Sequence, residues 1–472
     1  MTILDKRKLQ TIHSASVAAL RDIGMRVMDE KLRGTLSRCG LDVRGDRVFF
    51  DENTLMNLIQ RAPGEFLVHS RAGNNGKLIG RGAWALAPGY GCTSVVEHDK
   101  AIRPAVFADY LRFNKWIQAS DEMDFYGGLP VQPVDTPEHS PAFLIAAAMA
   151  LSDKCLLGIP AAGKELDAEF TLLKTVFGGE AAFCSTPKVM FLISTNSPLN
   201  LDYTNCEVLM KCCEHRQVQI VSPGPMQGAT SPVTASGTIV TGNAEALAVI
   251  AMIQAISPGN PVIYGVHPTV MNLQKASVSI GTPVFSTLCA ASLELAAYYG
   301  LPGRGAGAVT DADFVGIQSA YESAMSLGSG QEHGAAFVLH GAGILSAYGA
   351  MSYEKFLLDL ELIRRQSRYS KDMDVSDGCL ALDVITDSIG GGGFIAQPHT
   401  AEHCRQESYI AGISQSSLEG LHFLHAESEK MDTRWVPPRD MQEIQRAAGD
   451  VLGSFGYASC DFLKSLSLCE YI

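Results

Sequence analysis

From about residue 121 onward, short apolar runs alternate with longer stretches of helical periodicity. Strands that alternate with helices in this way pair in parallel through right-handed crossovers. The apolar runs predict strands at 123–127, 155–160, 188–194, 218–223, 261–265, 301–307 and 336–341. The stretches between them predict helices at 138–151, 164–177, 203–215, 233–256, 285–299, 312–327 and 352–366.

Seven strand–helix units are therefore clear, and they predict an α/β protein with a TIM (β/α)8 barrel. The eighth strand is expected near 374–397, where the pattern is ambiguous. An open doubly wound sheet is the alternative, and it is less favoured because no GxGxxG follows the first strand.

The segments on either side of 121–430 have a different pattern of apolar and polar residues. Residues 5–40 and 51–62 have helical periodicity, the second with Asp51 as a possible N-cap, whereas the alternating runs of 64–106 suggest hairpins. We therefore predict three parts. These are an N-terminal α+β segment at 1–120 packed on the barrel, the barrel at 121–430, and a helical C-terminal tail at 431–472.

Composition narrows the class of protein. The 472 residues are 46% hydrophobic and 18% charged, so the chain is large enough to bury an extensive core, and its apolar content suggests a homo-oligomer. A net charge of −13 argues against nucleic acid as a partner. Twelve scattered cysteines fit a reducing cytoplasm. We find neither a secretory signal nor a membrane span in the sequence, and we expect a cytoplasmic protein.

Active-site residues of a barrel come from the C-terminal ends of its strands. Arg304 follows an apolar strand and can grip a carboxylate, although it can equally pair with an internal acid. Asp311 precedes a predicted helix and can serve as an N-cap or in catalysis. Further polar or aromatic candidates at these ends are Gly127, Gly128, Ser194, Thr195, Asn196, Ser222, Pro223, Gly224, Tyr264, His267 and His340.

Two groups of His and Cys residues have spacings similar to those of metal ligands, but neither matches a complete metal-binding motif. His399 and His403 stand at i and i+4 but lack the HExxH order, and Cys212, Cys213 and His215 share one predicted helix. P-loop and GxSxG patterns are absent from the sequence. We therefore expect no tightly bound metal.

One block of sequence carries a family resemblance. Residues 228–265, GATSPVTASGTIVTGNAEALAVIAMIQAISPGNPVIYG, resemble the core block of the trimethylamine methyltransferase superfamily nearly position for position. Further blocks at 88–104, 197–199, 298–323, 352–362 and 399–400 follow in the same order, so the resemblance covers roughly residues 85–405. It implies a TIM barrel that passes a methyl group to the corrinoid of a separate protein.

The sequence departs from that family in two places. The trimethylamine branch uses pyrrolysine, which is not written here, and Val284 stands where an acidic residue is usual. Members without pyrrolysine resemble quaternary-amine methyltransferases, with glycine betaine as the leading substrate. A methyl on a quaternary nitrogen is already activated because the leaving group is a neutral amine. Positioning and desolvation before a Co(I) nucleophile would then suffice.

The resemblance and the strand-end pattern together give the expected site. Aromatic faces would bind the trialkylammonium group, and cationic or imidazole groups would anchor a carboxylate. We assign Asp311 and His340 to catalysis, Tyr90, Tyr264, His267, Arg304 and Tyr353 to substrate binding, with Phe337 as a further aromatic candidate, and Gly224, Gly228 and Asn196 to the corrinoid. Proline betaine or carnitine as substrate, a zinc-dependent methyltransferase, and a non-catalytic methylamine-binding barrel remain alternatives.

Overall fold

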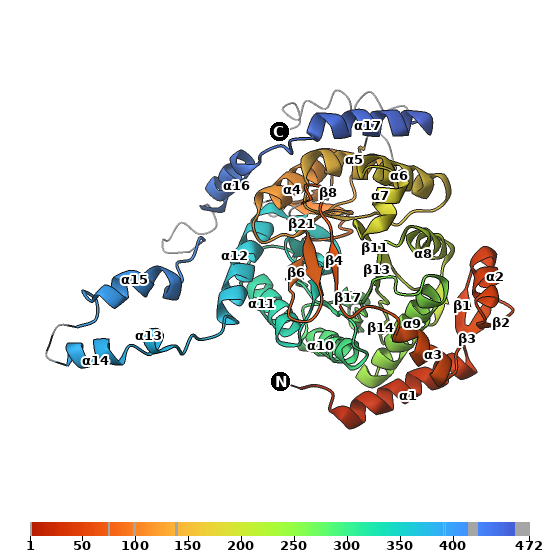
Figure 1. Ribbon diagram of the computed structural model, residues 1–472, viewed down its shortest axis with the longest axis horizontal. Helices are drawn as coiled ribbons and strands as arrows, with labels where there is room; N and C mark the ends of the chain where they lie inside the picture. Colours follow the sequence, from red (N-terminus) through yellow and green to blue (C-terminus); the bar gives the residue numbers. More distant parts are fainter. Residues whose placement is uncertain are drawn as a thin grey trace.

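Two parallel sheets, one of five strands and one of three, are surrounded by helices in the computed structural model (Figure 1). The structure describes residues 2–73, 76–97, 101–136, 140–389, 391, 393–413 and 423–457. The eight parallel strands are β6 (Ala85–Leu86), β9 (Phe125–Gly127), β10 (Cys155–Leu157), β11 (Val189–Ile193), β13 (Val218–Val221), β15 (Val262–Tyr264), β18 (Arg304–Gly305) and β19 (Phe337–Val338).

Hydrogen bonds connect these eight strands in one order. β9, β10, β11, β13 and β15 pair in parallel, and a parallel bridge between Tyr264 and Gly303 leads on to β18. β18, β19 and β6 also pair in parallel. The amide of Asp124, directly before β9, donates to the carbonyl of Leu86 in β6 at 2.9 Å. All seven predicted strands are therefore present.

The predicted helices are also present, within a few residues of the expected bounds. Only the helix expected at 312–327 is displaced by several residues, because 306–316 forms a loop first. The helices around the sheet are α4 (Phe107–Ala119), α5 (Pro141–Leu151), α6 (Gly163–Val176), α7 (Glu180–Ser185), α8 (Tyr203–His215), α9 (Ala235–Ile256), α10 (Pro283–Tyr298), α11 (Ile317–Glu332) and α12 (Tyr353–Tyr369).

The eighth strand was expected in the wrong place. Residues 374–397 contain the helices α13 (Asp377–Leu380) and α14 (Leu382–Ser388), and β6 from the predicted hairpin region is the eighth parallel strand. Only two residues of β6 pair, and Pro88 follows shortly afterwards, so the segment is too short to show a strand pattern. The other hairpins are confirmed as β4 (Phe66–Val68) with β5 (Lys77–Ile79) and β7 (Ser94–Val96) with β8 (Ile102–Pro104).

The prediction of a helix over residues 5–40 is also wrong. α1 (Lys6–Asp22) ends before Gly24, whose φ of +74° favours glycine, and the chain then forms β1 (Met25–Val27) and α2 (Glu30–Arg38). The helix at 51–62 is confirmed as α3 (Glu52–Ile59), and the carboxylate of Asp51 accepts from the amide of Thr54 at its N-terminus. Met25 and Arg26 of β1 also pair with β3 (Arg47–Phe49), which pairs in turn with β2 (Asp42–Arg44).

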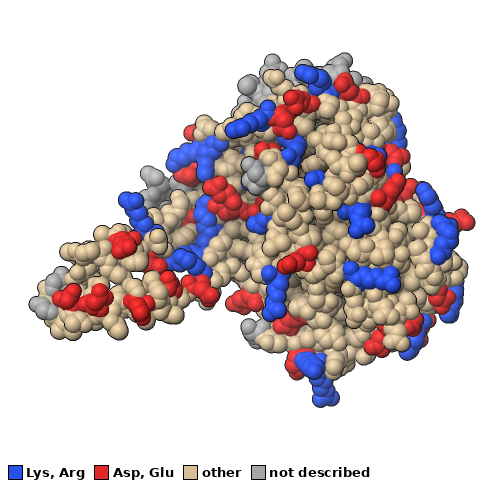
Figure 2. Space-filling view, in the orientation of Figure 1, with Lys and Arg blue, Asp and Glu red and all other residues tan. Residues whose placement is uncertain are grey.

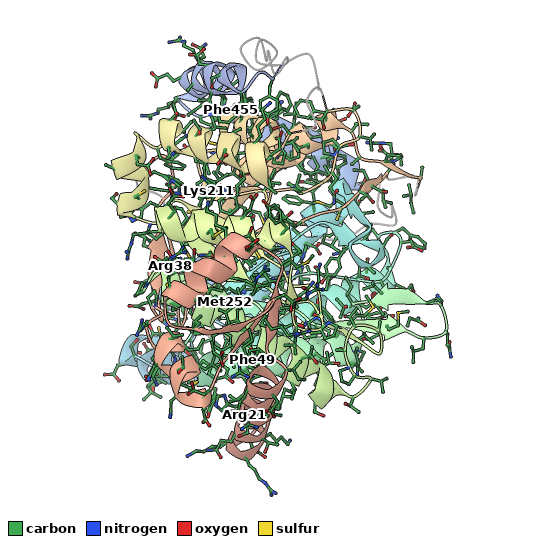
Figure 3. All side chains as sticks on the ribbon, turned by 90° about the vertical axis from the view of Figure 1, so that its right-hand side faces the viewer. Arg21, Arg38, Phe49, Lys211, Met252 and Phe455 are labelled. Atoms are coloured by element: carbon green, nitrogen blue, oxygen red, sulfur yellow. The ribbon has the colours of Figure 1, made fainter. Side chains whose placement is uncertain are left out.

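The core has two layers. In the inner layer, side chains of the parallel strands pack on one another: Phe125 and Phe337 meet edge to face at 5.5 Å, with Val218, Ile220 and Ile263 in the same cluster. A larger apolar layer lies between the strands and the helices. Figure 3 shows the N-terminal helices against the outer side of this layer, which contains the fully buried Met252 of α9.

Among the described helices, α9 alone is long and apolar enough to cross a membrane by length and composition. However, 78% of its most apolar window is buried inside the protein, and α1, α3 and α10 pack against it. The apolar character of this helix is therefore explained by its place in the core.

Two further regions complete the chain. On one side, α15 (Pro398–Glu407) follows α14 in an arm that projects from the body, before α16 (Phe423–Arg434) and α17 (Met441–Ser454) return to it (Figures 1 and 2). α17 packs on α5 and α6, and the rest of the predicted tail, 458–472, lies outside the described residues. The remaining elements are β12 (Asn200–Leu201), β14 (Met226–Gln227), β16 (Thr269–Asn272), β17 (Ser277–Ser279), β20 (Ile344–Leu345), η1 (Ser346–Tyr348) and β21 (Ala350–Ser352).

Candidate functional site

A buried arginine without an acidic partner marks the centre of the site. Arg304 begins β18, and only 4% of it is exposed. Its Nη1 donates to the hydroxyl of Ser222, which donates in turn to the carbonyl of Gly265 at 2.8 Å. Its Nε has no hydrogen-bond partner, and no carboxylate of the described residues forms an ion pair with it. Burial lowers the pKa of the guanidinium to about 10, so it is still charged at neutral pH.

A buried charge without a counter-ion is costly, and a fold keeps it where a bound anion completes the arrangement. The planar fork of a guanidinium matches a carboxylate. Arg304 can therefore hold a carboxylate that enters from outside the chain.

Two histidines lie beside this arginine. His267 follows β15 and His340 follows β19, both are 7% exposed, and their rings are 6.1 Å apart. Burial, and then the positive charge of Arg304, hold the pKa of each imidazole well below its usual range. Both rings are therefore neutral at physiological pH. The Nδ1 of His340 has no partner in the described residues and is free to bond a ligand.

Tyr348 closes the side of this group. Its hydroxyl lies 2.5 Å from the Nε2 of His267, and its ring centre lies 4.6 Å from that of His340. Ser346, Ala347 and Tyr348 have φ values of +50°, +49° and +73°, a left-handed run that non-glycine residues rarely adopt. Such strain is retained where it positions a functional side chain.

Sequence reasoning missed Tyr348. It lies ten residues after the last residue of β19, beyond the positions where strand-end residues are expected. The only signal was an aromatic residue in the Gly-rich turn that follows a candidate histidine.

The backbones of the two neighbouring strand ends touch at the site. His340 itself has a φ of +64°, and a Cβ atom at Gly307 would overlap its carbonyl oxygen. Only glycine fits at position 307, and its absent side chain lets the end of β19 bring His340 beside Arg304.

Tyr90 lies at the same end of the sheet, after β6. Its ring rests on Gly128, where a Cβ atom would come within 2.7 Å of a ring carbon. The charge of Arg304 lowers the pKa of the Tyr90 hydroxyl, but burial raises that pKa by more. Tyr90 is half-buried and packs against the core inside the strands. Its ring can therefore form part of the wall of the site.

Asp311 connects the end of β17 to the start of α11, beside the C-terminal ends of the parallel strands. Its carboxylate accepts from the amide of Ile280 at 2.6 Å and from the hydroxyl of Ser279. The amide of Asp311 donates to Glu322 at 2.9 Å. Asp311 lines a cavity of about 650 Å³ between the β16–β17 hairpin and the start of α11, whose wall also includes Ser346 and Ala347 of the Tyr348 turn. These contacts fit a positioning role for Asp311, and its assignment to catalysis stays a prediction.

Three predicted aromatic residues lie elsewhere. The hydroxyl of Tyr264 donates to Asn243 of α9 at 2.8 Å, and Tyr353 donates to Asp109 of α4 at 2.7 Å. Phe337 belongs to the inner apolar cluster of the strands. Neighbouring residues of a strand face opposite sides, and because Ile263 belongs to that inner cluster, Tyr264 points outward to the helices. The structure does not bring Tyr264, Tyr353 or Phe337 to Arg304.

The three residues assigned to the corrinoid are on the surface loops of this end. Gly224 is exposed and close to His267, since its Cβ atom would lie 3.7 Å from the His267 carbonyl. Gly228 is half-buried with a φ of +83°. Asn196 is exposed in a loop that Glu245 fixes through the hydroxyls of neighbouring residues.

The possible metal ligands do not form a centre. The ring centres of His399 and His403 lie 4.4 Å apart, with the rings tilted, on α15 in the projecting arm, while Cys212 is fully buried in α8. Nowhere in the described ranges do three or more His, Cys, Asp or Glu side chains gather in a way that could hold a metal ion.

Comparisons with known proteins agree on one family. A family model described as trimethylamine methyltransferase (MTTB) matches residues 1–419. The chain is 33% identical to a glycine betaine methyltransferase of Desulfitobacterium hafniense, over 94% of each chain. It is 28% identical to a proline betaine:corrinoid methyltransferase of Eubacterium limosum, over 95% of this chain and 96% of that protein.

Among solved structures, the monomethylamine methyltransferase of Methanosarcina barkeri has a similar fold. The TM-score is 0.53 at 12% identity, and the match covers 96% of this chain and 88% of that one.

The outward position of Tyr264 is testable. Tyr264→Phe removes the hydrogen bond to Asn243 and leaves the amide oxygen short of a donor, so the free energy of unfolding should fall by about 1–2 kcal/mol. The affinity of the Arg304 site for a carboxylate ligand should stay within about twofold of wild type. Chemical denaturation and calorimetric titration measure the two effects, and a large loss of affinity at unchanged stability would return Tyr264 to the site.

The neutral histidines predict a pH effect. Their folded-state pKa lies below the unfolded value near 6.5, so the unfolded chain binds more protons in acid and stability falls as the pH drops below about 6.5. His340→Gln removes one such group. The free energy of unfolding of wild type minus that of the variant should therefore decrease as the pH falls from 7.5 to 5.5, by on the order of 1 kcal/mol, as urea denaturation can measure. A constant difference over this range would show that His340 is not held neutral.

Proposed function

Because the chain belongs to the trimethylamine methyltransferase (MTTB) family, we propose that it transfers a methyl group from glycine betaine to the Co(I) corrinoid of a partner protein. The observation that carries the choice of substrate is the buried, acid-free Arg304 beside aromatic and neutral imidazole rings. A zwitterion with a carboxylate and a trimethylammonium group complements both halves of this arrangement.

Different residues bind the two charged ends of the zwitterion. Arg304 binds the carboxylate, and the unpartnered Nδ1 of His340, when protonated at that nitrogen, donates a hydrogen bond to it. The rings of Tyr348 and Tyr90 face the trimethylammonium group, each worth about 0.5–2 kcal/mol. Because both histidines are neutral, they add no positive charge that would repel the ammonium.

The chemical step asks for little beyond this binding. The bond between the methyl carbon and nitrogen breaks, its electron pair stays on nitrogen, and dimethylglycine leaves as a neutral amine with its carboxylate. The partner's corrinoid supplies the electron pair that receives the methyl group. The protein positions the methyl group for in-line displacement and excludes water from it.

The rim of the site fits a large, partly apolar macrocycle. Val233, Leu273 and Ile317 are 63%, 69% and 87% exposed around the loops of this end. Exposed apolar side chains in one region mark an interaction surface. We place the partner's corrinoid here, over the cavity that Asp311 lines, and near Gly224, Gly228 and Asn196.

The same proposal includes the architecture. The parallel order of the eight strands and the hydrogen bond between Asp124 and Leu86 support a closed TIM (β/α)8 barrel. In it, β6 joins the strands of 121–430, the rest of the described residues of 1–120 packs outside them, and the described part of the tail is 431–457.

Proline betaine has the same pairing of a quaternary nitrogen with a carboxylate, and it is the second candidate substrate.

Methyl transfer from glycine betaine to Co(I) cobalamin, followed by the cobalt absorbance spectrum, tests the proposal. Wild type should react, and Arg304→Met should raise the KM for glycine betaine by about 10–100-fold because a charge-assisted bond is lost. Tetramethylammonium, which has no carboxylate, should not lose reactivity in this variant. Arg38→Met on the exposed side of α2 is the matched control. Absence of transfer from every betaine tried, with the partner protein present, would overturn the proposal.

Two substitutions of Tyr348 distinguish the contribution of its ring from that of its hydroxyl. Tyr348→Leu removes a cation–π contact and should raise the KM by about 3–30-fold. Tyr348→Phe keeps the ring and loses only the contact with His267, so its KM should remain near that of wild type. Tyr203→Leu, at an exposed tyrosine of α8, controls for the substitution. Equal losses in the Phe and Leu variants would show that the hydroxyl, and not the ring, binds the substrate.

A further inference from the structure

The projecting arm is the least explained part of the molecule. Residues 371–413 leave the body after α12 and carry α13, α14 and α15 (Figures 1 and 2). None of these three helices contains a buried residue. Helices of 4, 7 and 10 residues are too short to be stable in water without packing against something.

The arm exposes large apolar side chains at an unusual density. Of the twenty-six such side chains that are exposed in the described residues, ten lie between 373 and 410. Ile395, Ile410 and Met373 are 91%, 89% and 86% exposed. The others are Val375, Leu380, Leu382, Ile385, Ile389, Phe394 and Tyr409. A concentration of this kind marks a surface that is covered in the working protein.

The arm is fixed at its base, so it does not fold back freely over its own body. The guanidinium of Arg368 donates to the carbonyl of Glu407 at 2.9 Å. This hydrogen bond connects the segment where the arm leaves α12 with the segment that returns to it. Tyr409 and Gly412 donate to the carboxylate of Glu361 on α12 at 2.8 and 3.1 Å. Both ends of the arm are therefore held on α12.

We propose that the arm of each chain packs on the body of a second copy of this chain, in the groove between α11 and α12, so that two copies exchange arms. This groove has a volume of about 780 Å³ and adjoins the base of the arm. Met325, Leu362 and Tyr369 give it apolar walls. Its charged residues are Glu332 and two arginines, Arg365 and Arg368, that already form ion pairs with Glu361 and Glu407.

The area also suits a pair of copies. Burying a large aliphatic side chain removes about 60–120 Å² from water, so one arm offers roughly 700 Å² of apolar surface. In a two-fold arrangement each chain buries its own arm and receives the other, which exceeds the about 800 Å² per partner of a stable interface. A corrinoid protein that must leave after each transfer would uncover the arm in every cycle, so it is the less suitable occupant.

The mass of the protein in solution tests this proposal. Light scattering after size exclusion should give twice 50.6 kDa, or a higher even multiple, for the full chain at micromolar concentration. Ile389→Asp combined with Ile395→Asp should weaken self-association by at least about 100-fold. Ala324→Trp should do the same by filling the groove from the other side. Ile102→Asp, at an exposed isoleucine of β8 outside the arm, should leave the mass unchanged.

The circular dichroism of each variant separates dissociation from unfolding, since arm and groove variants should keep the helical signal of the body. The proposal is overturned if the full chain is a monomer, or if the arm variants keep the mass of the wild type. It is overturned equally if the full chain is a monomer whose arm is needed to bind the corrinoid protein. The mass does not depend on the substrate, so this result and the methyl-transfer assay can fail separately.

Discussion

An unneutralised guanidinium inside the protein is the constraint on which the candidate site depends. The chain places Arg304 out of contact with water, gives it a serine hydroxyl, and supplies no acid from the described residues. Truncating a buried charge partner usually costs several kcal/mol, and this fold accepts such a cost in its free state. We propose that a bound anion recovers this penalty, so that the site favours ligands with a carboxylate over simple methylated amines.

The acids near the mouth are used for a different purpose. Asp311 is bonded to the end of β17, Glu245 to the loop after β11, and Asp359 to the amide of Gly343 and the ammonium of Lys355. Each of these carboxylates fixes a loop, so none is available to Arg304. Hydrogen bonds that rigidify the loops in this way keep the site in its binding geometry before a ligand arrives.

The periodicity of the sequence was enough to place the strands and helices of 121–369, because long apolar segments carry a strong pattern. It also placed Arg304, His267 and His340 at strand ends. It could not tell that Tyr264 points outward, since a fully buried strand is apolar on both faces and its alternation is hidden. β6 and Tyr348 were missed for another reason. Their positions are set by pairing and by a strained turn, which involve residues distant in the sequence.

The close approach of Gly307 to the carbonyl of His340 limits how the pocket can change. With backbone against backbone, the two strand ends have no side chain that can be exchanged for a smaller one. Room for a bulkier substrate must therefore come from the turn that carries Tyr348. Relatives that accept different methyl donors should accordingly diverge in that turn while retaining the glycine, and redesign of the donor range should begin there.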